Sequence, residues 1–110
     1  MSSIGEIKEP NYISTDVVAK ESGATYRQLD YWVREGLISP VKQKGGIGYP
    51  RGWDRDQIPE IAFLRRVQSA FSSSKMPMEI LKRFLVAYRA GYNYLPLEGG
   101  FLITWTREEI

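Results

Sequence analysis

The stretch from Ser14 to Pro40 constrains the fold of this 110-residue chain more than any other, because it reads as two short helices joined by a tight turn. Ser14 is a suitable N-cap for the first helix, and Asp16 places a carboxylate in the first turn, where the helix dipole favours it. Ala19 would let two helices approach closely, and Gly23, four residues on, can supply the positive φ of the turn. The pattern predicts a helix-turn-helix.

The second helix of this pair is expected to open at Thr25 and to end near Gly36. Thr25 and Gln28 have the spacing of a reciprocal capping box, and a glycine suits the C-terminal cap. At about 100° per residue, the apolar and the basic side chains separate onto opposite faces. The face predicted to join the core carries Leu29, Trp32 and Val33, and the outward face carries Arg27, Tyr31 and Arg34.

The outward stripe of two arginines and a tyrosine suits a DNA groove. Arginine can form paired hydrogen bonds with a guanine edge or a phosphate, and a tyrosine hydroxyl can bond a phosphate. The stripe alone is equally compatible with a merely solvated helix face. Asp30, at its edge, argues against DNA, because a carboxylate repels phosphate unless it accepts from cytosine or pairs with Arg27 or Arg34.

The run from Arg27 to Pro40 resembles the recognition-helix signature of MerR-type winged-helix regulators, in which an arginine, a leucine, two aromatics and Gly-Leu followed by Pro recur. The run from Gly48 to Asp54 is similar to the wing of that family, usually a Tyr-Arg-x-Tyr segment ending at a helix cap. The resemblance extends from about Tyr12 to Tyr88. It departs at Asp30, where a basic or polar residue is commonest, and at Pro50, where arginine is usual.

Residues 41–53 read as two alternating segments around a glycine-rich turn, which predicts a short hairpin, the wing. Lys42 and Lys44 share one face of their strand, and Arg51 could join them beside a phosphate backbone. Such contacts position a protein on DNA without reading its sequence. Trp53, at the end of the hairpin, is predicted to anchor the core, because a buried tryptophan contributes a large apolar area.

Two further helices are expected after the wing. Asp54 and Gln57 can form a capping interaction where a third helix starts, and this helix should continue to Phe71. Pro77 starts a fourth helix that should continue to about Ala90, with a broad apolar face. Five cations on these helices look solvated: Arg65, Arg66, Lys82, Arg83 and Arg89.

Residues 92–106 contain two β-favouring runs around a Glu-Gly-Gly turn, which predicts a hairpin. Its side chains Phe101, Ile103 and Trp105 lie on one face and need a cover. Either the third and fourth helices cover them, or the face or strand edge pairs with a second copy of the chain. Pairing would matter for function, because two copies can read adjacent half-sites.

Composition limits the chemistry of the chain. It has no cysteine and no histidine, which excludes disulfides, thiolate or imidazole metal sites, and Cys or Ser-His nucleophilic catalysis. No apolar run could span a bilayer and no secretory signal is visible, so we expect a soluble, cytoplasmic protein without membrane contact.

The net charge is only +2, but residues 20–55 and 56–90 each carry +3, whereas residues 1–19 and 91–110 each carry −2. A basic middle favours nucleic-acid binding.

These patterns predict a mainly α-helical, winged helix-turn-helix domain over residues 12–90, with a two-stranded wing and two further helices. A flexible arm, residues 1–11, precedes it, and a β-type tail, residues 91–110, follows and either packs on the domain or dimerises. The predicted function is sequence-specific binding of double-stranded DNA by a small transcriptional regulator, with no catalytic residue, cofactor or metal. The residues expected to contact DNA are Thr25, Tyr26, Arg27, Gln28, Tyr31, Arg34, Lys42, Lys44 and Arg51.

Two alternatives remain open. An excisionase-like accessory factor, which bends DNA for a recombinase, resembles the same family in its winged domain. A protein-interaction module that kept the fold and lost DNA binding is the alternative of another class, favoured by Asp30 and the low net charge. Full-length members of the family continue into a dimerising helix and an effector domain, whereas nineteen residues follow Gly91 here, so no small-molecule effector is expected.

Overall fold

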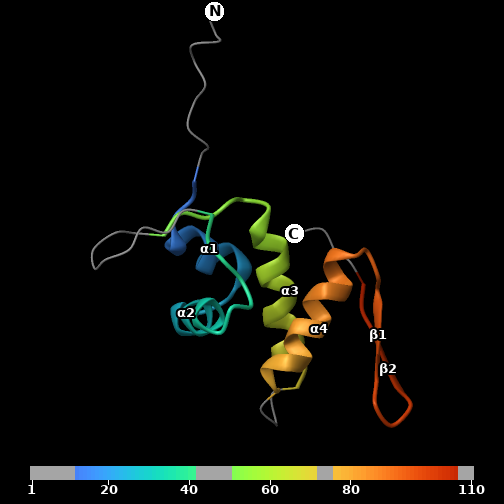
Figure 1. The fold of residues 1–110 in the computed structure, drawn as a ribbon. Coiled ribbons are helices and arrows are strands. Elements are labelled where there is room, and N and C mark those ends of the chain that lie inside the picture. Colours follow the sequence, from blue (N-terminus) through green and yellow to red (C-terminus); the bar gives the residue numbers. More distant parts are fainter. Residues whose placement is uncertain (1–11, 42–50, 72–75, 107–110) are drawn as a thin grey trace, which may run out of the picture.

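The computed structural model describes residues 12–41, 51–71 and 76–106 (Figure 1). This part of the chain is mainly helical, as predicted, and ends in a two-stranded antiparallel hairpin. Its elements are α1 (Thr15–Ser22), α2 (Tyr26–Arg34), α3 (Gln57–Ala70), α4 (Met78–Arg89), β1 (Tyr94–Leu97) and β2 (Phe101–Thr104). The predicted arm, residues 1–11, and most of the predicted wing, residues 42–50, lie outside the described residues.

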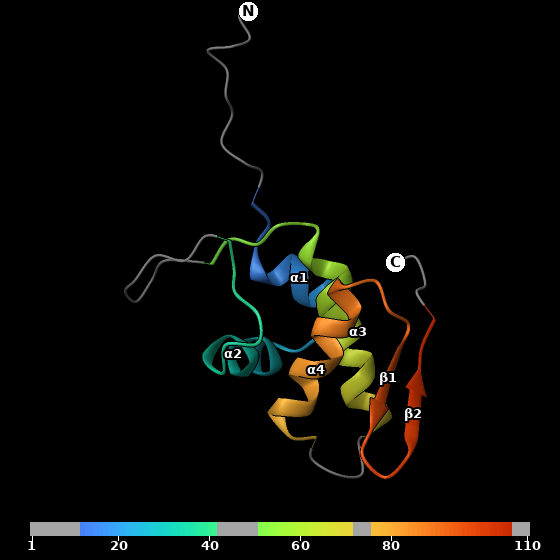
Figure 2. The same ribbon diagram turned by 45° about the vertical axis from the view of Figure 1, so that its right-hand side comes forward.

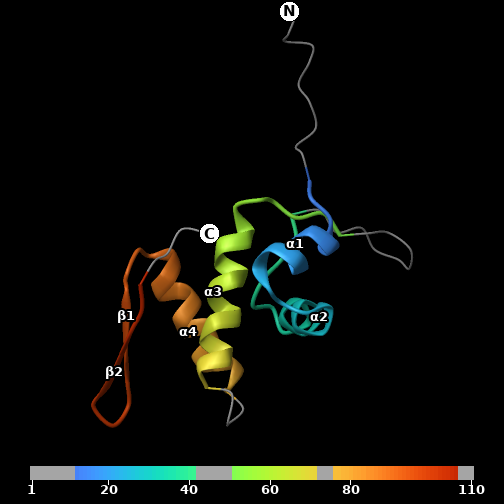
Figure 3. The same ribbon diagram turned by 180° about the vertical axis from the view of Figure 1, so that it is seen from behind.

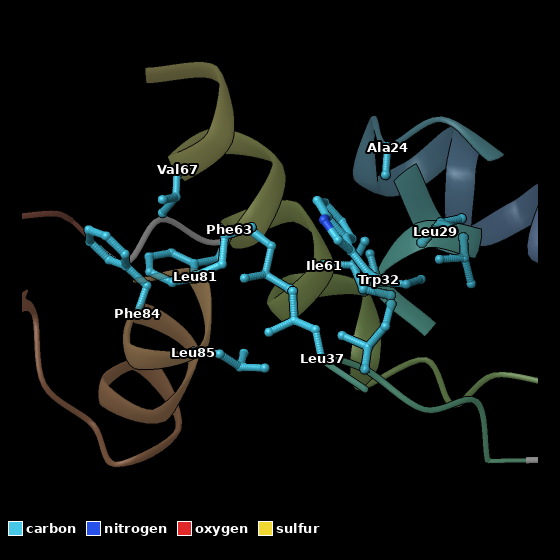
Figure 4. Packing of buried hydrophobic residues seen from close by; sticks show 14 of the residues in the cluster. Ala24, Leu29, Trp32, Leu37, Ile61, Phe63, Val67, Leu81, Phe84 and Leu85 are labelled. Carbon is cyan, nitrogen blue, oxygen red and sulfur yellow. The ribbon is translucent and has the colours of Figure 1, made fainter. Parts of the chain in front are cut away.

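α3 is the central element of the fold. Seen from behind, α1 and α2 lie on one side of α3, whereas α4 and the hairpin lie on the other (Figure 3). Side chains of α3 therefore pack in both directions: Ile61 lies beside Trp32 of α2, and Phe63 extends toward Phe84 of α4 (Figure 4). One continuous core joins the helix-turn-helix to the C-terminal elements.

The turn between α1 and α2 has the predicted geometry. Ser14 caps α1 by accepting a hydrogen bond from the amide of Val17 at 3.3 Å, and Gly23 ends the helix with a φ of 85°. A Cβ at Gly23 would lie only 2.6 Å from Nε of Arg65, so a larger residue would displace that side chain. Glycine is favoured here by its positive φ, and its lack of a side chain leaves room for the guanidinium of Arg65.

The prediction that Arg65 is solvated was wrong. Its Nε donates a hydrogen bond to the backbone carbonyl of Ser22 at 3.2 Å, across the closely packed end of α1. That carbonyl belongs to the last turn of α1, where no intrahelical partner is available, so the arginine satisfies an otherwise orphan acceptor. Arg66 is likewise only partly exposed.

Trp53 anchors the chain after the wing to the segment before α1, as its predicted role in the core requires. Its side chain is fully buried, and its Nε1 donates to Oγ1 of Thr15 at 2.9 Å. The backbone of Trp53 also exchanges two hydrogen bonds of 2.9 Å with Ile13. The base of the predicted wing is thereby attached to the start of α1.

Two cations of α4 that were predicted to be solvated make tertiary contacts. Arg89 donates two hydrogen bonds of 2.9 Å to the carboxylate of Glu60 on α3, and this hydrogen bonding raises the pKa of Arg89 above its ordinary value. Arg83 donates to the carbonyl of Pro96 in β1 at 3.0 Å. These contacts link α4 to both of its neighbours, while Lys82 is exposed as expected.

The hairpin packs on the third and fourth helices of its own chain, which is one of the two arrangements considered from the sequence. The ring of Trp105 lies 5.1 Å from that of Phe63 and 5.7 Å from that of Phe84, centroid to centroid. Ile103 is partly buried beside it, whereas Phe101 remains 68% exposed. The helices therefore cover only part of the apolar face.

We predict that Thr15→Val will lower the free energy of unfolding by about 1 to 3 kcal/mol. The change keeps the side-chain shape but leaves the buried indole N–H of Trp53 without its acceptor, and an unpaired buried donor costs about that much. Denaturant unfolding of the variant and the unmodified protein measures the difference. Thr106→Val is the matched control, because Thr106 is exposed and should tolerate the change. Equal destabilisation by both substitutions would contradict the prediction.

Candidate nucleic-acid interface

The start of α2 is capped reciprocally, as the sequence predicted. Oγ1 of Thr25 accepts from the amide of Gln28 at 3.0 Å, and Oε1 of Gln28 accepts from the amide of Thr25 at 3.0 Å. The capping box satisfies two amide donors that would otherwise lack partners at the helix N-terminus. It thus defines where α2 begins and how it leaves the turn.

The inner face of α2 sets its rotation about the helix axis. Leu29 and Trp32 are fully buried, and Val33 is partly buried beside them. Past the helix, Gly36 adopts a φ of 77°, and the amide of Leu37 donates to the carbonyl of Trp32 at 2.9 Å. This reversal turns Leu37 back into the core. The capping box therefore fixes the start of α2, the buried Leu37 fixes its end, and the inner face packs on the core.

The opposite face of α2 is open to solvent, as predicted. Arg27 and Arg34 are exposed, and the exposed fractions of Tyr26 and Tyr31 are 55% and 43%. The guanidinium carbon of Arg34 lies 5.9 Å from the ring centroid of Tyr31, within the range of a cation–π contact. In Figure 2 α2 lies at the side of the molecule remote from the hairpin.

Asp30 forms ion pairs with two arginines. Its Oδ2 lies 3.2 Å from Nε of Arg34, one helical turn away, and its Oδ1 lies 3.1 Å from Nη2 of Arg51, at the far end of the predicted wing. The Arg34 pair was among the alternatives considered from the sequence, and the Arg51 pair was not. The i,i+4 spacing could reveal the first, but the second joins residues far apart in sequence.

These pairs change the electrostatic role of Asp30. An isolated carboxylate on this face would repel a polyanion, whereas here two guanidinium groups balance its charge at contact distance. Arg27, Arg34 and Arg51 together outnumber Asp30, so the described part of the face is basic. Arg27 forms no ion pair with any residue that the structure describes.

The structure gathers seven of the nine predicted contact residues on or beside α2. Thr25, Gln28 and Arg51 hold the local structure through the capping box and the Asp30 pair, which occupy one polar atom of each side chain. The residues whose side chains face solvent on α2 are Tyr26, Arg27, Tyr31 and Arg34. Lys42 and Lys44 lie outside the described residues.

Two further kinds of site were searched for among the described residues. Across residues 12–41, 51–71 and 76–106, no cluster of three or more His, Cys, Asp or Glu side chains is arranged to hold a metal ion. No helix in these same ranges combines the length and apolar character needed to cross a bilayer. The arrangement around α2 is suited to contact with an anionic surface through arginine and tyrosine side chains.

Comparison with known proteins agrees with this geometry. A search of curated proteins found no match to the chain. The family model of the MerR HTH family regulatory proteins, however, matches residues 13–83, which span α1, α2, α3 and the first half of α4. That is well over half of the chain. The chain therefore belongs to the MerR family of helix-turn-helix regulatory proteins, a family of DNA-binding transcription regulators.

Proposed function

We propose that this protein binds double-stranded DNA sequence-specifically as a transcription regulator, with α2 inserted in the major groove. The observation that supports this most is the outward presentation of Arg27, Tyr31 and Arg34 by a helix whose inner residues Leu29 and Trp32 are fully buried. The major groove is about 12 Å wide and accommodates one α-helix. A helix held at both ends can enter it without losing its orientation.

Arg27 and Arg34 are the proposed base-reading residues. Asp30 engages Nε of Arg34, which leaves the two terminal nitrogens of that guanidinium for a guanine edge or a phosphate. Arg27 extends from the first turn of α2, the part of a recognition helix that reaches furthest into the groove. Tyr31, between them on the same face, would offer its hydroxyl to a phosphate.

Gln28 and Arg51 have a positioning role in this proposal. Oε1 of Gln28 is used in the capping box, so a paired contact of its amide with adenine would break the cap. Arg51 holds Asp30, and through Asp30 it holds Arg34. Lys42 and Lys44, outside the described residues, remain proposed contacts with the phosphate backbone, as does Thr25.

We predict that Arg27→Ala will weaken binding to a specific site by about 1 to 3 kcal/mol, which is about 5- to 150-fold. The site is first obtained by selecting bound sequences from a random duplex pool, and affinity is then measured by fluorescence anisotropy over a salt titration. Lys82→Ala is the matched control, because it also removes one exposed cation but lies on α4. A loss of affinity of the same size in both variants would show that only net charge matters.

The salt titration separates DNA binding from the alternative function, a protein-interaction module that has lost DNA binding. If phosphate contacts contribute to affinity, the logarithm of the association constant should fall linearly with the logarithm of the salt concentration. Arg27→Ala should reduce that slope if Arg27 contacts a phosphate, and relax the sequence preference if it contacts a base. A chain that ignores duplexes even at low salt would refute the proposed function.

We predict that Asp30→Asn will raise affinity for nonspecific duplex and reduce discrimination in favour of the selected site. The change removes the carboxylate that holds Arg34 and Arg51, so both guanidinium groups gain freedom and the face becomes more basic. Stability should change by less than about 1 kcal/mol, because the side chain of Asp30 is half exposed. Anisotropy titrations with the selected and a scrambled duplex measure the discrimination.

Glu21→Gln is the control for this experiment. It changes net charge by the same amount and breaks a comparable exposed pair, between Oε1 of Glu21 and Nη1 of Arg55 at 3.1 Å, on α1. Unchanged discrimination in Glu21→Gln, together with reduced discrimination in Asp30→Asn, would assign the effect to the orientation of the α2 arginines. Retained discrimination in Asp30→Asn would show that the Asp30 pairs do not position Arg34.

A further inference from the structure

The two edges of the C-terminal hairpin differ in their free hydrogen-bonding groups. In the register of the hairpin, Pro96 of β1 lies opposite Leu102 of β2, and the amide of Trp105 donates to the carbonyl of Asn93 at 3.0 Å. Hydrogen-bonded and non-hydrogen-bonded pairs alternate in an antiparallel ladder. The Pro96–Leu102 pair is therefore non-hydrogen-bonded, and the backbone groups of Leu102 and Thr104 point to the outer edge of β2.

The outer edge of β1 is closed. Pro96 has no amide hydrogen, and its carbonyl accepts a hydrogen bond from Nη2 of Arg83 at 3.0 Å. α4 also packs beside β1, whereas β2 lies on the side of the hairpin away from α4 (Figure 2). An additional strand therefore cannot pair along β1.

The outer edge of β2, by contrast, carries none of the usual protections among the residues that the structure describes. Its sequence, Phe-Leu-Ile-Thr, contains no charge, no proline and no bulge, which are the features that keep natural edge strands from pairing. The side chains of Phe101 and Leu102 are 68% and 58% exposed. Among the residues that the structure describes, none donates to or accepts from the outward amides and carbonyls of Leu102 and Thr104.

We propose that β2 is a self-association site, at which the β2 strands of two copies of this chain pair antiparallel about a two-fold axis at Ile103. This register places Leu102 opposite the partner's Thr104. Because both residues turn their backbone groups outward, each such pair can exchange two hydrogen bonds, and symmetry doubles them. The two hairpins then form one four-stranded sheet with β1 of each copy at its edges.

A second copy suits this edge because the strand is complementary to itself. In the same register, the exposed ring of Phe101 lies opposite the partner's Trp105, and cross-strand aromatic pairs stabilise sheets. Phe101, which the helices of its own chain leave uncovered, thereby packs against the partner's Trp105. The strand carries no charge, so the symmetric pairing brings no like charges together.

The association is weak on its own. Four residues at about 3.4 Å each form an edge only about 14 Å long, and so short an edge buries much less than the about 800 Å² per partner of a stable interface. Its role depends on the proposed function: DNA that binds two copies at adjacent half-sites raises their local concentration, and the β2 contact then makes binding cooperative.

Cysteine cross-linking tests the pairing without DNA. The chain has no cysteine, so Leu102→Cys and Thr104→Cys each introduce a single thiol. In the proposed register position 102 faces the partner's position 104 with Cα atoms about 5.5 Å apart, which a disulfide can bridge, whereas two copies of position 102 lie about 8 Å apart. Mixing the two variants and oxidising them should therefore yield the mixed disulfide well above the half expected from random pairing.

The controls separate this register from chance collision. Val86→Cys places a thiol on an equally exposed apolar position of α4 and should cross-link to neither strand variant above the random level. A random mixture of disulfides, or enrichment of the Leu102→Cys homodimer, would overturn the proposed pairing. Mass spectrometry under non-reducing conditions identifies each species.

We predict that Thr104→Pro will abolish concentration-dependent self-association in sedimentation velocity, because it removes an outward amide without touching the bonds between β1 and β2. Leu102→Lys keeps the backbone intact and should have the same effect through edge charge. Circular dichroism checks that both variants fold. An unmodified chain that stays monomeric at millimolar concentration would overturn the proposal, and this result would leave the anisotropy measurements of DNA binding unaffected.

Discussion

Burial of Trp32 against α3 is the interaction on which the rest of the candidate interface depends. A nine-residue helix such as α2 is too short to be stable in water by itself, so its existence and orientation come from tertiary packing. Trp32 contributes the largest side chain of its inner face and lies beside Ile61 (Figure 4). With that face fixed, Arg27, Tyr31 and Arg34 have only one direction in which to point.

The second constraint is the connection between the helix-turn-helix and the segment that follows the predicted wing. Trp53 attaches this segment to Ile13 and Thr15, and Arg51, two residues earlier, reaches Asp30. In the sequence, Asp30 looks unfavourable for DNA binding. In the structure, it is the residue at which α2 and the segment after the predicted wing meet. Asp30 and its two arginines form a small charged network that joins α2 to the segment after the predicted wing.

The C-terminal elements extend the same core in the opposite direction. α4 is linked to α3 through Glu60 and Arg89, and the hairpin closes over both helices with Trp105. This packing covers the Trp105 end of the hairpin's apolar face and the β1 edge of its sheet. The Phe101 end of that face and the β2 edge are left exposed. The proposed DNA interface and the proposed self-association site therefore lie at opposite ends of one core.

Much of this was determined by the sequence alone, because the signals are local. Helix caps at Ser14 and Thr25, the positive-φ glycine at the turn and the separation of faces along α2 each involve residues within one or two helical turns. Only the tertiary structure decided which cations have distant partners: Arg65, Arg83 and Arg51 find acceptors far away in the chain, and no periodicity encodes those contacts. Local patterns specify which way a side chain points, but what it meets there depends on how the helices pack.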